Sequence, residues 1–422
     1  LVIVNLYAFA RTAADPSKSF EDIVEMIDIG GPSMVRGAAK NWEDVGVVVD
    51  AADYPAVLEG LRAERSIPRA LRLTLAAKAF AHTAAYDAAV AAYLSRAASP
   101  ETASKAELAD ALALDFPKAA DLVYGENPHQ RAAFYRDPEA LGASLATARQ
   151  LQGKPLSFNN ILDFDAALSL AADLKRRACV IVKHGNPCGV GLGDDPAAAF
   201  ALALACDPTS AFGGVIAFSE AVDGPTADAI AGAFYEGVIA PSFTAEAVGT
   251  LARKKNLRLL ELGPLAGYRR EGLDLRRVQG GLLAQDWDQP DPPVREGRVV
   301  TTRPPTDEEW KALQFAWTVV RHVKSNAIVY ANASRTLGIG AGQMSRVDSA
   351  RLAITKSLVS LHGAAMASDA FFPFRDGLDT AAEAGITAVV QPGGSIRDDD
   401  VVAAANERGL TMVLVGRRHF RH

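Results

Sequence analysis

The sequence predicts an α/β (α+β) protein built from more than one domain. Its 422 residues are too many for one ordinary hydrophobic core. Short apolar runs typical of buried strands, such as residues 179–182, alternate with alanine-rich stretches that favour helices. Hydrophobic residues make up 49% of the chain and charged residues 22%, which is ordinary globular composition.

The first 50 residues predict a strand, a helix and a second strand. The first strand begins at residue 1 without a preceding Met, and we expect that earlier residues are missing from this chain. The start also lacks the basic segment and cleavage site of a signal peptide. Pro32 suits the first turn of a helix that runs to Lys40, and residues 45–50 are typical of a buried parallel strand.

An alanine-rich, mostly helical stretch follows over residues 53–115. The segment 124–130, with the sequence YGENPHQ, breaks this pattern and leads into a short strand at 132–135. We place one domain boundary near 116–123 and a second within 286–305, which is rich in Asp, Pro and Arg like a linker. The predicted domains are 1–115, 116–285 and 286–422.

A capping box at Thr306 and Glu309 opens the next helix. We expect this helix to end near Asn326, just before a strand at residues 327–330. Asn326 could polarise a carbonyl group, but taken by itself it is more typical of a helix C-cap. The apolar face of the helix contains Trp310, Leu313, Trp317 and Val320.

A weak internal repeat runs through the second and third domains. Residues 180–183 and 327–330 are predicted strands, and glycines, a helix and a further strand follow each of them. The first copy ends near Gly214 and the second near Phe372. Two copies of one strand, glycine loop, helix and strand unit indicate two similarly folded halves.

The strongest candidate for a reactive centre is Lys183 with His184, at the exit of a buried strand. Open α/β sheets bind ligands at such exits. A lysine beside a histidine can stabilise negative charge and move a proton at one point. The alternative is a surface lysine and a hydrogen-bonded histidine, because adjacent strand residues usually point to opposite faces.

Two further segments are candidates for anion binding. Residues 338–342 predict a flexible glycine loop leading to Arg346, whose guanidinium could bind an anion; an ordinary loop fits equally well. Tyr7, Asp28 and Lys40 are proton-active groups near one Gly-Gly-Pro helix start, which could also receive phosphate. Lys40 alone is more typical of a solvated helix face.

Charge and cysteine content argue against several classes of protein. The net charge of −6 does not suit a surface that coats nucleic acid, and no apolar run reaches the ~18 residues of a membrane span. Cys179, Cys188 and Cys206 show no CxxC spacing, so we expect a reducing cytoplasm. A zinc deaminase needs a P-C-x-x-C motif, and Gly191 stands where its second cysteine belongs, so we expect no zinc.

Motifs spread over the whole chain resemble the bifunctional AICAR transformylase/IMP cyclohydrolase family of purine biosynthesis, in which AICAR is aminoimidazole carboxamide ribonucleotide. They occur in the order typical of that family. The motifs are NLY at 5–7, IDIGG at 27–31, AAKN at 38–41, YGENPHQ at 124–130, KHGNPCG at 183–189, SAFGG at 210–214, KSNA at 324–327, GAGQ at 340–343, FPFRD at 372–376, QPGGS at 391–395 and RHFRH at 418–422.

This resemblance implies a fold for each of the three domains. The first would be a partial cyclohydrolase domain of the methylglyoxal-synthase-like type, in which the family's earlier strands, phosphate-binding loop and one catalytic lysine are absent from this sequence. The second and third would be cytidine-deaminase-like halves of the transformylase, which agrees with the weak repeat.

For the transformylase, the resemblance implies transfer of a formyl group from the cosubstrate 10-formyltetrahydrofolate to AICAR. His184 would be the general base, Lys183 would stabilise developing charge and help the folate N10 leave, and Asn326 would hold the formyl oxygen or the substrate. Arg346 or Arg418 would suit the phosphate. The nucleotide-site positions would be Tyr124, Gly213, Glu236, Arg346 and Arg418. The positions on or near the folate side would be Val347, Phe374, Asp379, Ser395 and Ile396.

For the cyclohydrolase, Tyr7, Asp28 and Lys40 match catalytic positions that would close the ring of formyl-AICAR to give IMP. Asn5 and Gly30 would line that nucleotide site. The family also implies a homodimer whose subunits share each transformylase site, and a monovalent cation such as potassium is compatible with it.

Two departures from the family pattern leave alternatives open. The family commonly has Arg where this chain has Val123, which removes a cation from the AICAR site, and Pro where it has Ala8. A catalytically impaired homologue that binds nucleotides or acts in assembly would bind AICAR or IMP without folate turnover. A metal-dependent deaminase is the third possibility, and it would require a bound zinc.

Overall fold

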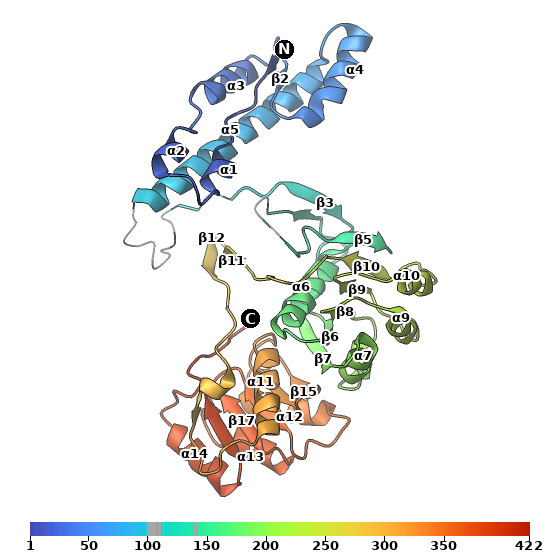
Figure 1. Cartoon of the computed structure of the whole chain (residues 1–422), viewed down its shortest axis with the longest axis vertical. Coiled ribbons are helices and arrows are strands. Elements are labelled where there is room, and N and C mark those ends of the chain that lie inside the picture. The colour runs from blue at the N-terminus through green and yellow to red at the C-terminus, as the bar shows by residue number, and fades with distance from the viewer. Residues whose placement is uncertain (99–107, 109–110, 113, 138–139, 141) are drawn as a thin grey trace. The chain divides into compact units, whose positions relative to one another are not determined.

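The computed structural model describes residues 1–98, 108, 111–112, 114–137, 140 and 142–422. The chain divides into two compact units, Leu1–Asp115 and Phe116–His422 (Figure 1). Within the predicted helical stretch 53–115, residues 99–107, 109–110 and 113 lie outside the described residues. Among the helices described, none is long and apolar enough to cross a membrane.

The first unit has the predicted order of strand, helix and strand. Strand β1 (Val2–Ile3) pairs in parallel with β2 (Val47–Val48), as the apolar run at 45–50 predicted. Val35 and Ala39 of the intervening helix α3 pack with Val47 and with Ala76 of α5 in one apolar cluster. The helical elements are α1 (Phe9–Ala13), α2 (Phe20–Val24), α3 (Gly30–Lys40), the short 3-10 helix η1 (Ala51–Asp53), α4 (Tyr54–Glu64) and α5 (Arg69–Ala98).

The second unit contains two six-stranded mixed sheets of the same topology, which confirms the two similar halves that the repeat predicted. Their strand orders are β5-β10-β9-β8-β6-β7 and β13-β18-β17-β16-β14-β15. In each sheet three neighbouring strands are parallel, and an antiparallel hairpin flanks them on one side. The first sheet contains β5 (Arg149–Gln152), β6 (Ala178–Lys183), β7 (Asn186–Leu192), β8 (Val215–Phe218), β9 (Gly237–Ala240) and β10 (Arg258–Glu261). The second contains β13 (Arg298–Val299), β14 (Ile328–Ala331), β15 (Thr336–Gly340), β16 (Ala365–Ser368), β17 (Ala388–Gln391) and β18 (Thr411–Leu414).

Helices cover both faces of each sheet (Figure 1). Helices α6 (Phe158–Asp173) and α11 (Asp307–Val320) share one large apolar core with the facing sides of both sheets. The opposite face of each sheet has a core of its own. The helices on those outer faces are α7 (Pro196–Leu204), α9 (Gly224–Ala231) and α10 (Ala245–Leu251) in the first half, and α12 (Arg346–Lys356), α13 (Asp376–Glu383) and α14 (Asp398–Glu407) in the second.

The two sheets meet at their edge strands β7 and β15. The backbone N–H of Leu192 donates to the carbonyl of Ser334 over 2.7 Å, and the N–H of Val190 donates to Thr336 Oγ1 over 2.9 Å. The shared core and this edge contact explain why both halves belong to one compact unit. Outside the sheets lie the two hairpins β3 (Lys118–Leu122) with β4 (Ala132–Tyr135) and β11 (Leu273–Val278) with β12 (Gly281–Asp286), and the short helices α8 (Pro208–Ala211) and η2 (Val294–Glu296).

The predicted flexible glycine loop at 338–342 is wrong for Gly338 and Gly340, because both lie within strand β15, just as Gly189 of the first half lies within β7. A Cβ added at Gly189 would stand 2.0 Å from the carbonyl oxygen of Ala203 in α7. One added at Gly340 would stand 1.9 Å from the carbonyl oxygen of Ser349 in α12. These glycines are therefore required by the close approach of a helix to an edge strand, and not by an anion.

Gly340→Ala is expected to lower the free energy of unfolding by about 1–3 kcal/mol, the usual effect of overpacking a tight contact. The matched control is Gly249→Ala in α10, where an added Cβ meets nothing within 4 Å. Alanine should raise the stability there by up to about 1 kcal/mol, since it is the better helix former. Urea unfolding of both variants tests this, and equal midpoints would contradict the packing argument.

The predicted capping box at Thr306 and Glu309 is confirmed, but the helix that it opens ends at Val320. Asn326 therefore stands beyond the helix and is not its C-cap, which corrects the interpretation from local sequence. Residues 321–326 form instead a separate connection into β14, because the chain turns here toward the junction between the two halves.

Candidate functional site

Lys183 and His184 lie where they were expected, at the exit of a fully buried strand. Residues 179–182 of β6 have no exposed surface. Lys183 is the last residue of β6, and its Nζ donates to the carbonyl of Phe212 over 2.5 Å. His184 is exposed and lies in the turn to β7 with a left-handed φ of 54°. Because His184 has left the strand, the alternation of strand faces does not separate it from Lys183, and both line one pocket.

The carboxylate of Asp163, on α6, binds the backbone of this turn. Its Oδ1 accepts the backbone N–H of Gly185 over 2.6 Å, and its Oδ2 accepts that of His184 over 3.3 Å. Burial raises the pKa of the Asp163 carboxyl, although these two hydrogen bonds act in the opposite direction. Sequence reasoning missed Asp163, and the only signal was an acidic residue between the apolar Leu162 and Phe164 of the helix.

Gly213 comes close to Lys183, and the backbone N–H of Glu236 donates to the carbonyl of the next residue, Gly214, over 2.9 Å. A Cβ added at Gly213 would stand 3.7 Å from Lys183 Nζ, and Gly213 has a φ of 72° that suits glycine. Glu236 lies just before β9 and accepts from Arg258 Nη1 over 2.6 Å. Because β6 runs antiparallel to β8, its exit lies beside the N-terminal ends of the parallel strands. The pair thus lies at the exit of its own strand, as predicted, but at the opposite end of the sheet from the carboxyl ends of the parallel strands, where open α/β sheets usually bind ligands.

The second half contributes a buried network around Asn326. Its Nδ2 donates to the carbonyl of Gln343 over 2.9 Å, and its Oδ1 accepts from Arg346 Nη2 over 2.8 Å. Arg346 Nη1 also donates to Ser368 Oγ over 2.8 Å and to the carboxylate of Asp369, which has no exposed surface. Arg346 is only 8% exposed, and its guanidinium is paired with groups of the protein itself. It is therefore not the free cation at the end of an open loop that the sequence predicted.

The remaining predicted residues of the second half are at the surface or in their own contacts. Arg418 is exposed, with its guanidinium 4.6 Å from the ring of Phe420, and it has no carboxylate partner among the described residues. Asp379 is bonded to Arg375 over 2.7 Å. The others are Phe374, whose ring lies 5.1 Å from the Arg397 guanidinium, Ser395, whose N–H donates to Asp398 over 3.2 Å, the fully exposed Ile396, and the half-buried Val347.

The two halves bring their candidate residues together at one point. The N–H of Lys324 donates to Asn186 Oδ1 over 2.9 Å. Asn186 begins β7, two residues after His184, and Lys324 precedes Asn326 by two residues. The turn that carries His184 is therefore adjacent to the segment that carries Asn326.

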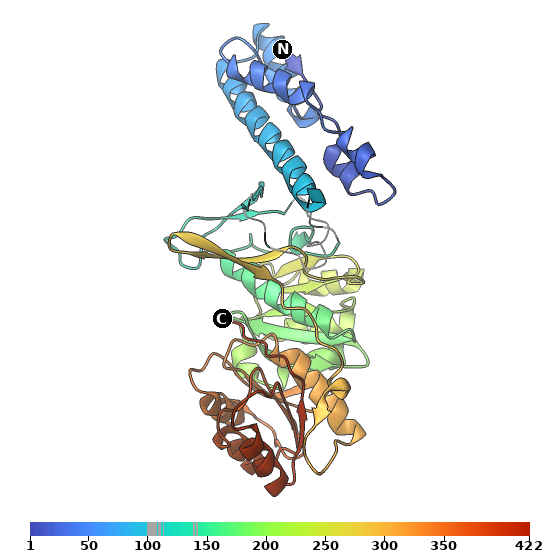
Figure 2. The same cartoon turned by 90° about the vertical axis from the view of Figure 1, so that its left-hand side faces the viewer.

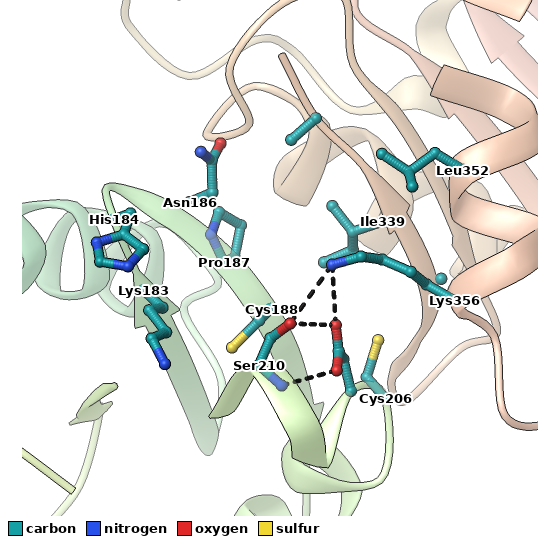
Figure 3. Close-up of a pocket in the computed structure, with 13 residues that line it drawn as sticks. Lys183, His184, Asn186, Pro187, Cys188, Cys206, Ser210, Ile339, Leu352 and Lys356 are labelled. Carbon is teal, nitrogen blue, oxygen red and sulfur yellow. Dashed lines mark hydrogen bonds and ion pairs between the residues drawn. The ribbon is translucent and has the colours of Figure 1, made fainter. Parts of the chain in front are cut away.

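A pocket of ≈ 230 Å³ opens beside this junction, with lining residues from both halves (Figure 3). Lys183 and His184 lie at one end of it and Lys356 at the other, where Lys356 Nζ pairs with Asp207 Oδ2 over 3.1 Å (Figure 3). Burial raises the pKa of Cys188, which also lines the pocket, to about 12. This thiol therefore stays protonated at neutral pH and is a poor nucleophile or metal ligand.

The segment 124–130 forms a compact turn next to α6. The N–H of Gly125 donates to the carbonyl of Gln130, and the N–H of Asn127 donates to the side-chain Oε1 of Gln130, both over 2.8 Å. Tyr124 is half-buried at the start of the turn. Val123 before it has 60% of its surface exposed, so the position has room for a longer side chain.

In the first unit only part of the predicted group comes together. Asp28 caps α3 by accepting the N–H of Gly31 over 2.7 Å, and it also accepts the N–H of Tyr7 over 3.2 Å. Lys40 is the last residue of α3, so it lies ~15 Å along the helix axis from the capped end. The sequence predicted that Lys40 lies near the Gly-Gly-Pro start. This prediction is wrong, because Lys40 lies at the other end of the helix. Asn5 and Gly30 are both exposed.

Comparison with known proteins identifies relatives along the chain. A family model described as "AICARFT/IMPCHase bienzyme" matches residues 38–356. The chain is 52% identical over 426 residues to a protein of Acidithiobacillus ferrooxidans named bifunctional purine biosynthesis protein PurH. That alignment covers 100% of this chain and 81% of the relative.

Proposed function

The chain belongs to the AICARFT/IMPCHase bienzyme family, and we propose that its second unit transfers the formyl group of 10-formyltetrahydrofolate to the amine of AICAR. One observation carries the proposal: Lys183 and His184 line a pocket at the junction of two halves, directly beside the segment of Asn326. A base and a cation in the pocket, with an amide donor on the adjacent segment, form the set of groups that acyl transfer to a weak amine requires.

The roles of these three residues follow from their chemistry. The AICAR amine is a weak nucleophile because its electrons are delocalised into the ring, so it must lose a proton as it attacks the formyl carbon. The exposed imidazole of His184 accepts that proton. Lys183 stabilises the charge that develops as the folate N10 leaves, and the Asn326 amide orients the formyl oxygen.

We assign Arg346 and Arg418 different roles. The guanidinium of Arg346 is buried and paired with Asp369, so it orients Asn326 and is not available for a phosphate. Arg418 is exposed and has no carboxylate partner in the part of the chain that is described, so the phosphate of AICAR is its natural ligand. Arg418→Ala should therefore raise the KM for AICAR more than it lowers kcat.

The finer organisation is also part of the proposal. Residues 116–285 and 286–422 would be cytidine-deaminase-like halves, and 1–115 a methylglyoxal-synthase-like domain that closes formyl-AICAR to IMP. Tyr7 and Asp28 would assist ring closure, whereas Lys40 would act only if the nucleotide lies along α3. A homodimer in a reducing cytoplasm would share its sites between subunits, and the free thiols of all three cysteines agree with that compartment.

Asp163→Ala is expected to lower kcat for formyl transfer by about 10–100-fold, since a misplaced base loses most of its effect. The variant removes the carboxylate that accepts the N–H groups of His184 and Gly185. Asp163→Asn keeps one acceptor oxygen and should lose less. The control is Asp228→Ala on the surface of α9, and an equal loss in it would contradict the positioning role of Asp163.

The direct test is to mix the protein with AICAR and 10-formyltetrahydrofolate, and to follow tetrahydrofolate release while separating formyl-AICAR from IMP. Folate turnover supports the transformylase. Turnover that stops at formyl-AICAR removes the cyclohydrolase part of the proposal, and turnover through to IMP supports both parts. AICAR binding without folate turnover would overturn the proposal.

That last outcome would favour an impaired nucleotide-binding homologue. The observation behind this second candidate is the exposed Val123, which stands where the family commonly has a cation. Val123→Arg should then restore turnover, because the position has room for the longer side chain.

A further inference from the structure

The C-terminal tail is fastened to the second half through one buried histidine. His419 is 2% exposed, and its Nδ1 lies 2.7 Å from Asp288 Oδ2 while its Nε2 lies 2.6 Å from Asp291 Oδ2. Carboxylates only accept hydrogen bonds when ionised, so both ring nitrogens must donate. The ring is therefore a doubly protonated imidazolium between two carboxylates.

The groups that face His419 come from three elements. Asp288 and Asp291 lie in the segment after β12, Trp317 lies on α11, and Arg417 lies in the tail itself. Asp291 also accepts from Trp317 Nε1 over 2.9 Å and from Arg417 over 3.4 Å. The Trp317 ring meets the imidazole edge to face, with 5.2 Å between centroids. Burial lowers the pKa of His419, but the two carboxylates outweigh it and raise it to about 9.

The clamped tail lies against the candidate site. The N–H of His419 donates to the carbonyl of Asp369 over 2.9 Å, and the N–H of Ser325 donates to the carbonyl of Arg421 over 2.9 Å. Ser325 Oγ donates to Asp369 Oδ2 over 2.5 Å. Both views of the molecule have the C-terminus beside the junction of the two halves (Figures 1 and 2). The tail thus contacts the residue before Asn326 and the backbone carbonyl of Asp369, the residue whose carboxylate pairs with Arg346.

We propose that His419 is a positioning residue for formyl transfer: clamped between Asp288 and Asp291, it holds the C-terminal tail against Ser325 and Asp369. Asn326 and Arg418 are thereby kept in place, although His419 itself touches no substrate. This inference rests on the proposed function. It assigns a role to a buried ion cluster that the transfer chemistry does not use.

The clamp has a defined dependence on pH. A folded pKa of about 9 is above the ordinary value of 6.5, so the imidazolium stabilises the clamp fully below about pH 6.5. That contribution falls as the pH rises and is lost above about pH 9. We therefore expect kcat to fall on the alkaline side of its pH profile.

Three variants of the full chain test the proposal. His419→Asn removes the charge and is expected to lower kcat at least tenfold and to speed amide exchange at Ser325 and Arg421 at least tenfold. His419→Lys restores a cation and should recover part of kcat, with its alkaline loss moved to higher pH because lysine titrates near 10.4. The control is His362→Asn, an exposed histidine for which neither readout should change.

The outcomes separate the clamp from the proposed function. Wild-type kcat and wild-type amide protection in His419→Asn would overturn the inference, and so would a loss of kcat that His419→Lys leaves unrecovered at every pH. If the wild-type chain itself transfers no formyl group, the proposed function fails. AICAR affinity by calorimetry and the exchange rates then decide: both must worsen in His419→Asn, or the positioning role is rejected.

Discussion

His184→Ala is expected to abolish formyl transfer while AICAR affinity stays within about tenfold of wild type, as for the loss of a base and not of a binding group. The ring of His184 is exposed and makes no hydrogen bond to any described residue, so its removal leaves no buried group unpaired. General bases commonly contribute 10²–10⁴-fold in rate, which makes this one of the two largest effects expected here. Steady-state kcat and calorimetric AICAR affinity measure it.

The backbone at His184 requires a second variant as control. Its φ of 54° lies in the left-handed region, where the backbone of alanine is strained and that of asparagine is tolerated. His184→Asn should therefore lose the same turnover as His184→Ala without straining the turn. Turnover near wild type in either variant would refute the role of His184 as the base, and a loss confined to alanine would point to the backbone instead.

Arg346→Leu is expected to give the largest loss of stability, about 3–5 kcal/mol, because it leaves Asp369 charged and unpaired in the interior. Asp369 has no exposed surface, and Arg346 is its buried cationic partner. Asn326 loses a donor in the same variant, so formyl transfer should fall as well. Urea unfolding of the full chain and kcat on the folded fraction are the two measurements.

Arg351→Leu on the same helix provides the matched control. Its side chain is 64% exposed, and it approaches Asp348 only to 3.8 Å, so its loss should change stability by less than about 0.5 kcal/mol. Adding Asp369→Asn to Arg346→Leu should recover part of the stability, since no charge is then left buried. Equal losses in Arg346→Leu and Arg351→Leu would show that the buried pair has no special weight.

Local patterns explain what could be predicted about the fold. The capping box at Thr306 and Glu309 is made by residues three apart, so its geometry depends on almost nothing else. The buried strand at 179–182 and the strand at 132–135 follow from apolar runs between polar turns. The two similar halves follow from a repeat of such elements, and the shared strand order of the two sheets bears this out.

Packing decided the points at which local patterns were misleading. A glycine-rich run such as 338–342 is typical of a loop, and only the close approach of helix α12 to Gly340 shows that this glycine belongs to a crowded strand. Asn326 is a residue type that is common at helix C-termini, but the helix ends before it, at Val320. Lys40 follows the Gly-Gly-Pro turn closely in sequence, yet a helix carries it away from that turn at 1.5 Å per residue.

The sequence by itself therefore determined the class of fold, the family and the Lys183 and His184 pair, because these depend on short patterns and ordered motifs. Only the tertiary structure decided which groups meet: Asp163 under the turn of His184, Asp369 beside Arg346, and the carboxylates around His419. Such partners lie far apart along the chain. Burial turns their pairing into a requirement, because an unpaired charge in the interior costs several kcal/mol, about as much as a whole domain's margin of stability.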